Sequence, residues 1–167
     1  MSQPADSPRP VRLPSLLLGI GMGGFIDGIV LHQMLQWHHV LTDTGRHPAG
    51  TVTGLEANTL ADGAFHAGTW LFVIAGVTLL LRAWQQDRLA PAVSTHLGLL
   101  LAGWGIFNVV EGATNHLLLG IHHVRDDLGG PLSWDLGFVA VGALLMLGGW
   151  WLARERAPAG HSAPPAR

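Results

Sequence analysis

The sequence predicts an all-α integral membrane protein, a four-helix bundle built as two tandem helical hairpins. Of its 167 residues, 49% are hydrophobic and only 12% are charged, which is about half the charged fraction of a typical soluble domain. Four apolar segments are each long enough to cross the hydrocarbon of a bilayer, which takes about 20 helical residues. A polar pattern in the first segment also returns in the third.

The four predicted transmembrane segments are similar in length and are separated by polar loops. We expect them at about residues 13–40, 59–81, 94–121 and 134–152. Together they make one transmembrane domain, 13–153. The flanking segments 1–12 and 154–167 combine Pro, Ala, Ser and Arg and are predicted to be disordered tails. Because no small-residue cleavage site follows a short apolar core, we expect no removable signal peptide.

The distribution of arginine predicts the orientation in the membrane. All nine basic residues are Arg, and seven of them fall in the two tails or between the second and third segments. Only Arg46 and Arg125 lie in the other two loops. The positive-inside rule therefore places both termini in the cytoplasm.

The polar pattern combines a carboxylate with imidazoles. Its first copy is Asp27-Gly28, His32 and the pair His38-His39. Its second copy lies 84 positions later and consists of Glu111-Gly112, His116 and the pair His122-His123. A titratable side chain at membrane depth costs a few kcal/mol, so such residues usually pair, bind a ligand or move protons. Because the first and third segments run in the same direction, the repeat predicts a pseudo-two-fold axis along the membrane normal.

The second and fourth segments bring polar residues to the same depth, in the outer half of the bilayer. Asn58, Asp62, His66 and Thr69 recur at helical spacing in the second segment. In the fourth, Asp135 has a Phe three residues on, as Asp62 does.

Helical geometry predicts how the first segment presents its residues. At 100° per residue, Asp27 shares a row with His38, and His32 shares another with His39. Gly24 and Gly28 fall between the two rows, where we expect the first and third segments to pack closely.

Imidazole and carboxylate without thiolate favour iron, copper or zinc as a bound metal, and the chain has no Cys. Carboxylate–histidine sets that project inward are typical of di-iron four-helix proteins. Two acid–histidine sets favour a pair of ions over a single ion. The carboxylates could alternatively orient the histidines. The candidate ligands, in order of preference, are His32, His66 and His116, then Asp27, Asp62 and Glu111, and then His38, His39, His122, His123 and Asp135.

Two other interpretations of the histidines stay open. Haem held between His32 and His116 is the competing cofactor, although the neighbouring carboxylates disfavour it. Alternatively, the imidazoles only hydrogen-bond between helices. For the four residues of the His-His pairs, a position near the membrane interface makes a solvated surface role as plausible as a ligand role.

These motifs resemble a family of small bacterial four-helix membrane proteins of unknown function, the DUF2243-type predicted membrane proteins. The resemblance implies the fold and a place in the bacterial inner membrane, and it brings no established activity. It rests on Gly23-Gly24-Phe25-Ile26-Asp27-Gly28, Leu31-His32-Gln33, Gln36-Trp37-His38-His39, Ala61-Asp62-Gly63-Ala64-Phe65-His66, Phe107-Asn108, Glu111-Gly112, Ile121-His122-His123-Val124-Arg125 and Trp134-Asp135.

The favoured function is a non-haem metal-dependent oxidoreductase acting on dioxygen, a quinol or another small lipophilic substrate. One alternative is a transporter of metal ions or protons, or a metallocentre assembly factor, with Asp27 and Glu111 as relay groups. Another is a haem-binding or structural subunit of a respiratory complex. Besides the lipid bilayer, candidate partners are respiratory-chain proteins or further copies of the chain. No basic stretch indicates binding of nucleic acid.

Overall fold

The computed structural model describes residues 11–90 and 92–154, and these residues form helices and loops without a β-strand. The predicted tails lie outside the described residues, except at 11, 12 and 154. The all-α prediction is confirmed. Four helices are long and apolar enough to cross a membrane: Leu13–Met34, Val52–Gln85, Val93–Leu118 and Leu132–Leu152.

The first and third of these helices each consist of two parts. Helix α1 (Leu13–Ile26) continues into the π-helix η1 (Asp27–Met34), and α3 (Val93–Glu111) continues into the π-helix η2 (Gly112–Leu118). The second is α2 (Val52–Gln85) and the fourth is α4 (Leu132–Leu152), preceded by the short 3-10 helix η3 (Asp126–Leu128). The first and third segments therefore end earlier than the predicted residues 40 and 121.

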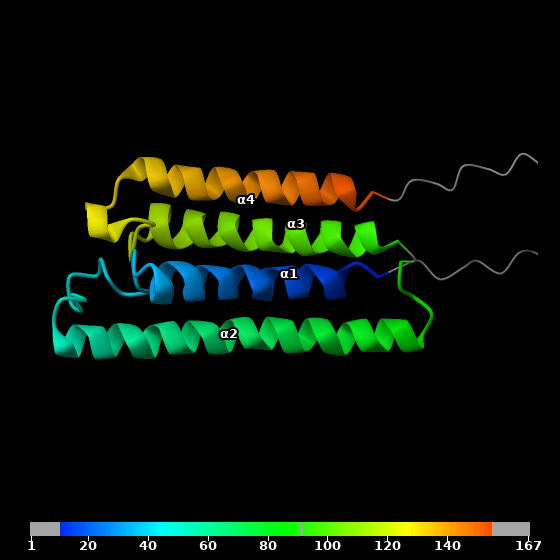
Figure 1. Ribbon diagram of the computed structural model, residues 1–167, viewed down its shortest axis with the longest axis horizontal. Coiled ribbons are helices and arrows are strands. Elements are labelled where there is room, and N and C mark those ends of the chain that lie inside the picture. The colour runs from blue at the N-terminus through cyan, green and yellow to red at the C-terminus, as the bar shows by residue number, and fades with distance from the viewer. Residues whose placement is uncertain (1–10, 91, 155–167) are drawn as a thin grey trace, which may run out of the picture.

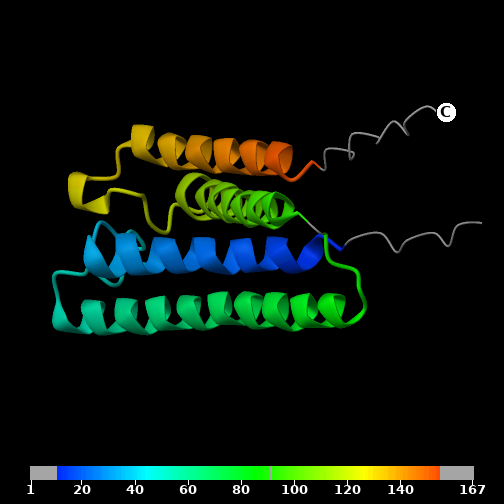
Figure 2. The same ribbon diagram turned by 45° about the vertical axis from the view of Figure 1, so that its right-hand side comes forward.

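The long helices lie side by side in a row, in the order α2, α1, α3, α4 (Figure 1). The same order is visible after rotation (Figure 2). Within the described residues α2 makes no contact with α4. The helices therefore do not close around a shared core, and α1 and α3 are the middle pair.

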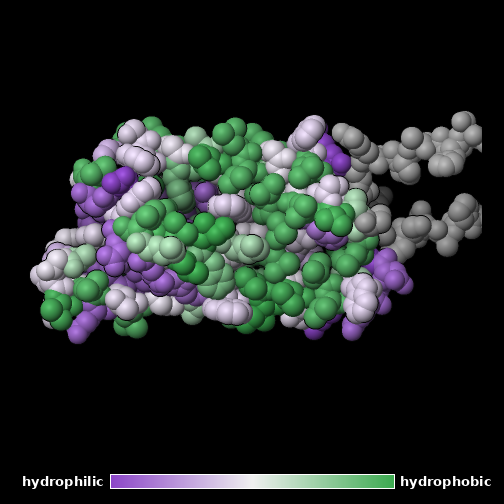
Figure 3. Space-filling view, viewed as in Figure 1, coloured by the Kyte–Doolittle hydropathy of each residue, from purple (hydrophilic) through white to green (hydrophobic). Residues whose placement is uncertain are grey.

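Successive helices run in opposite directions, so residues 11 and 154 lie at the same end of the row (Figure 1). The loops 35–51 and 119–131 lie at the other end. Much of the face shown in Figure 3 is hydrophobic, and hydrophilic residues show mainly towards its two ends. This pattern fits a protein whose helices are surrounded by lipid and whose loops reach the interface.

Glycines allow the middle helices to approach each other closely. A Cβ atom at Gly19 would collide with the carbonyl oxygen of Leu100 and would lie 2.9 Å from Cα of Gly103. The first and third segments thus pack on each other, but the prediction that they do so at Gly24 and Gly28 was wrong. The nearest atoms to a Cβ at Gly24 and Gly28 belong to α2.

Helix α2 begins seven residues before the predicted start at residue 59. The hydroxyl of Thr51 accepts a hydrogen bond from the backbone N–H of Gly54, at 3.1 Å. This N-cap satisfies one of the amides that the first helical turn leaves unpaired. The early start places Asn58 and Asp62 well inside the helix, facing the end of α1.

Candidate metal centre

The π-helices explain the spacing between acid and histidine. Their hydrogen bonds join residues five apart, as between the amide of Leu35 and the carbonyl of Val30, at 2.8 Å. Residues five apart then lie one turn above each other, whereas an α-helix would separate them by about 140°. The predicted rows, which assumed an α-helix through residue 39, were wrong because η1 is a π-helix and ends at Met34, before His38 and His39.

Each carboxylate consequently lies beside the imidazole five positions on. Oδ2 of Asp27 is 3.3 Å from Nε2 of His32. Oε2 of Glu111 is 3.2 Å from Nε2 of His116. All four side chains are buried, so these contacts form in the interior of the row, where α1 and α3 end.

After each π-helix the chain turns back towards this interior. Gln36 has a φ of 51° and Gly120 a φ of 55°, both in the left-handed region. The turns bring the next imidazoles inward, so that only 1% of His38 and 2% of His122 is exposed. Of the two roles left open by the sequence, the solvated surface role therefore does not fit these two residues.

The four inner imidazoles form one cluster. The ring centroids of His32 and His38 are 4.4 Å apart, those of His38 and His122 are 4.8 Å apart, and those of His116 and His122 are 4.9 Å apart. Two groups within the cluster could hold a metal ion, because their ligand atoms all lie within 4.8 Å of one another. They are His32, His38 and His122, and Glu111, His116 and His122.

Backbone carbonyls fix the tautomers of the two imidazoles that turn back. His38 donates from Nδ1 to the carbonyl oxygen of Val124, and His122 donates from Nδ1 to that of Val40, each at 3.1 Å. Since a carbonyl only accepts, the neutral ring keeps its lone pair on Nε2. Burial, and secondarily the neighbouring His32 and His122, lower the pKa of His38 far below its usual value. His38 is therefore neutral, the form that binds metals.

Asp62 binds the residues that the first segment contributes to and around the cluster. Its carboxylate accepts hydrogen bonds from Nδ1 of His32 at 3.0 Å and from Nδ1 of His39 at 2.7 Å. It also accepts one from the backbone N–H of Val40 at 3.1 Å. Asp62 thus fixes both a helical imidazole and the segment that turns back.

Asp135 makes the corresponding contacts in the second half. It accepts hydrogen bonds from Nδ1 of His123 at 2.7 Å and from the N–H of Val124 at 2.9 Å, and it lies 3.6 Å from Nδ1 of His116. Because these contacts match those of Asp62, they support the predicted pseudo-two-fold relation, which stays a prediction.

Some buried polar atoms of the cluster have no hydrogen-bond partner within the described chain. Among the described residues, several buried atoms of the cluster make no hydrogen bond: Oδ1 of Asp27, Nε2 of His32, Nε2 of His38, Oε2 of Glu111 and both ring nitrogens of His116. Leaving such an atom unpaired costs about 1–3 kcal/mol. In addition, Nε2 of His122, which carries a lone pair whenever the ring is neutral and donates from Nδ1, lies 2.9 Å from Oε1 of Glu111. Two acceptors at this distance repel each other unless a proton or a metal cation lies between them.

His66, a first-choice ligand from the sequence, lies outside both groups. Its ring stacks on Phe25 with centroids 5.9 Å apart and lies 5.8 Å from the ring of Phe65. His39 and His123 are also outside the groups and bind Asp62 and Asp135 instead. His123 is partly exposed and lies 3.3 Å from Asp43.

Sequence reasoning missed two kinds of residue at the site. Val40 and Val124 supply the carbonyls that orient His122 and His38, and a Val does follow each His-His pair in the sequence. The Phe three residues after each Asp also has a place there. Phe65 stacks on His32 with centroids 5.7 Å apart, and Phe138 lies 5.2 Å from His116.

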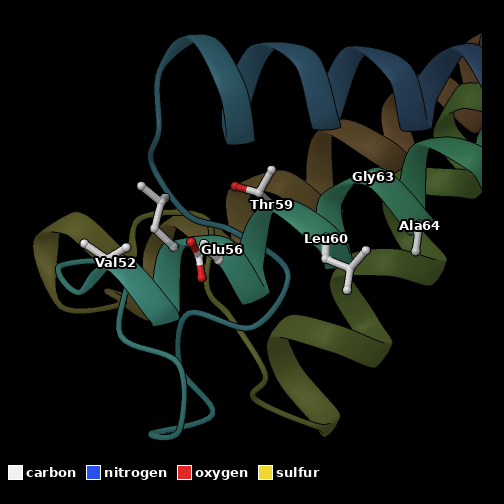
Figure 4. Close-up of a pocket in the computed structure, with 7 residues that line it drawn as sticks. Val52, Glu56, Thr59, Leu60, Gly63 and Ala64 are labelled. Carbon is white, nitrogen blue, oxygen red and sulfur yellow. The ribbon is translucent and has the colours of Figure 1, made fainter.

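A large hollow at the start of α2 is separate from the cluster (Figure 4). It has a volume of about 670 Å³ and follows one face of the helix. Glu56 is the single carboxylate among its lining residues, and no imidazole is among them: Val52, Leu55, Glu56, Thr59, Leu60, Gly63 and Ala64. It therefore does not contribute to the metal-ligand groups.

Four membrane-length helices with a buried histidine–carboxylate cluster at one end define a multi-pass membrane protein. The chain belongs to the family described as predicted membrane protein (DUF2243), whose family model matches residues 14–156. This match confirms the resemblance seen in the motifs. No curated protein and no solved structure matches the chain significantly.

Proposed function

We propose that this membrane protein holds a non-haem metal centre where α1 and α3 end, and that the centre serves a metal-dependent oxidoreductase. The observation that carries the proposal is the set of buried nitrogen and carboxylate atoms that converge without hydrogen-bond partners. Two sets of three ligands suit a pair of ions. His122 occurs in both groups, so we assign it to the second set and add Asp27, which lies 3.3 Å from His32, to the first. The sets are then Asp27, His32 and His38, and Glu111, His116 and His122.

The surroundings of the imidazoles support metal ligation. Metal-binding histidines usually donate their second ring N–H to a carboxylate or a backbone carbonyl, which raises the basicity of the ligand. His32 has this arrangement with Asp62, and His38 has it with the carbonyl of Val124. Nitrogen and oxygen donors without sulfur favour iron, copper(II) or zinc. When bound, a redox-active ion would supply electron transfer or substrate activation.

The arrangement supports a non-haem centre over haem. A haem between His32 and His116 would need the space between these rings for its porphyrin. The rings of His38 and His122 lie there instead, since that of His38 is 4.4 Å from His32 and 5.8 Å from His116.

A fixed centre is favoured over a transport path. In the described residues, all buried Asp, Glu and His side chains belong to the cluster or to the residues that bind it. In the opposite half of the row Gly19 packs against Gly103, and the buried polar side chains there, Ser15 and Thr95, carry no charge. A path for protons or metal ions would need titratable groups along its whole length.

We further propose that the protein lies in the bacterial inner membrane with cytoplasmic termini, which puts the centre in the outer half of the bilayer. The arginines support this orientation. Arg12 and Arg154 flank the start of α1 and the end of α4, and Arg82 and Arg88 line the same hollow as Val11. The four arginines therefore lie at the end of the row where the described chain begins and ends.

The proposal is tested by elemental analysis of the full-length protein, purified in detergent after growth with iron, copper and zinc. We expect stoichiometric metal in the wild type and loss of most of it in His32→Ala combined with His116→Ala. His66→Ala is the matched control, because it removes an imidazole of the same membrane region that lies outside both groups. Far-UV circular dichroism and gel filtration show whether each variant is folded. Wild type without stoichiometric metal, or a double variant that keeps its metal, would refute the proposal.

A further inference from the structure

A groove of about 360 Å³ lies beside the cluster, between α1, α2 and the end of α3. Every residue that lines it belongs to a helix that could cross the membrane. The groove is therefore accessible to molecules dissolved in the bilayer. Its lining residues are Ile20, Phe65, Phe72, Ile106, Phe107, Val110, Glu111, Thr114 and Asn115.

The walls of this groove are aromatic and aliphatic. Three of the five phenylalanines of the chain line it, and the rings of Phe65 and Phe107 lie 6.0 Å apart. Phe72 and Val110 are exposed, so they form its mouth. Aromatic walls favour a planar ring, which gains offset-stacked or edge-to-face contacts.

The groove contains one carboxylate, that of Glu111, which is also assigned as a metal ligand. Glu111 is only 6% exposed, and its Oε2 makes no hydrogen bond in the part of the chain that the structure describes, although it lies 3.2 Å from Nε2 of His116. A carboxylate has about four lone-pair positions. It can therefore ligate an ion and still accept a hydrogen bond from a molecule in the groove.

We infer that this groove binds a hydroxylated aromatic lipid of the quinol class, whose ring packs between the phenylalanines and whose hydroxyl donates to Glu111. This inference rests on the proposed function, because Glu111 connects the groove to the metal centre. An acyl chain would fill the apolar walls but would add no donor for Glu111, which among the groove residues accepts only a long hydrogen bond, from Nδ2 of Asn115 at 3.4 Å. A molecule with both a ring and a hydroxyl satisfies both parts of the groove.

A second groove provides the internal control. It has a volume of about 340 Å³ and lies between η1 and α4. Its walls are also apolar and aromatic, with Trp37, Trp134 and Phe138 among them, but its lining includes neither a carboxylate nor an imidazole. The inference predicts that a quinol occupies the groove with Glu111 and not this one.

The test is equilibrium binding of decylubiquinol to the full-length protein in nanodiscs, kept anaerobic, with the metal content measured on the same samples. Ile106→Trp fills the groove with Glu111, and Val110→Trp obstructs its exposed mouth. Val141→Trp fills the second groove. We expect both variants of the first groove to weaken quinol binding by at least about tenfold through steric overlap, and Val141→Trp to bind within about twofold of wild type.

The outcomes separate the groove from the metal centre. A wild type with stoichiometric metal that does not bind decylubiquinol would overturn the groove and leave the centre standing. A wild type that binds decylubiquinol but contains no metal would overturn the metal centre and leave the groove standing. Equal weakening by Val141→Trp, or displacement of the quinol by decanol at the same concentration, would also overturn the inference. The latter result would indicate a site for acyl chains.

Discussion

His38 and His122 stack their imidazole rings with centroids 4.8 Å apart and only 6° between the ring planes, although 84 positions separate them in the chain. Two imidazolium cations at this distance would repel strongly in a buried site. The stack therefore excludes a state in which both rings are protonated, and a neutral ring is also the form that binds metals.

This stacked pair allows the number of ions to be tested. In the proposed assignment, His38 belongs to one ligand set and His122 to the other. We therefore expect His38→Ala and His122→Ala each to remove one of the two ions. Inductively coupled plasma mass spectrometry on dialysed protein measures the stoichiometry. If each variant instead kept the wild-type stoichiometry and bound its metal more weakly, a single shared ion would be the correct description.

Asp62→Asn and Asp135→Asn test the outer carboxylates. Each loses the charge that orients imidazoles of the cluster, and loss of such a partner typically lowers metal affinity by about 10–100-fold. Competition with a chelator measures the affinity. Asp127→Asn is the matched control, since Asp127 pairs with Arg125 at the surface and does not contact the cluster. A control that loses as much affinity as Asp135→Asn would contradict this role.

Gly19→Ala tests the contact between α1 and α3. Its Cβ would meet the backbone of Leu100 and Gly103, which cannot move aside as a flexible side chain can. We expect the free energy of unfolding to fall by about 1–3 kcal/mol, measured by thermal or denaturant unfolding in detergent. Gly63→Ala, in α2, meets nothing within 4 Å and should be neutral or stabilising. Equal effects of the two substitutions would show that the helices do not pack at Gly19.

Gln36 and Gly120 follow the two π-helices in left-handed conformations. We expect substitutions at these residues to change the unfolding temperature in opposite directions. Gly120→Ala places a Cβ in a conformation that costs roughly 1–2 kcal/mol for residues other than glycine, so it should lower the unfolding temperature. Gln36→Gly relieves the same cost and should raise it. Differential scanning calorimetry in detergent compares both variants with wild type. A shift of both in the same direction would mean that the turns do not adopt this conformation.

The sequence predicted the four membrane helices and the residues of the cluster because both depend on local patterns. Apolar length determines the helices, and the repeat of acid, glycine and histidine marks the ends of the first and third. The predicted ranking of the candidate metal ligands agreed less well with the structure, because it placed His66 in the first rank. His66 lies on the same helix as Asp62, and nothing in its spacing shows that its ring turns towards Phe25.

The geometry at the ends of the first and third membrane helices could not be predicted, because it depends on tertiary contacts. The π-helical hydrogen bonds compete with α-helical ones of similar strength, and the packed imidazoles decide between them. Gly120 is a recognisable helix terminator, whereas Gln36 at the equivalent position carries no such signal. The row of helices, in place of a closed bundle, follows from which glycines permit close approach, and many glycines in the sequence are equally suited to it.

The hydrogen bonds that the imidazoles of His38 and His122 donate to the backbone carbonyls of Val124 and Val40 have a consequence for biogenesis. An amino-terminal hairpin emerging from the insertion machinery has no acceptor for His38 until the polypeptide has been extended through residue 124. Asp135, which holds residues 123 and 124 in place, arrives with the last helix. The cluster can therefore be complete only after the fourth helix has been made, and a chain truncated before that helix would lack the hydrogen bonds that Asp135 accepts from His123 and Val124.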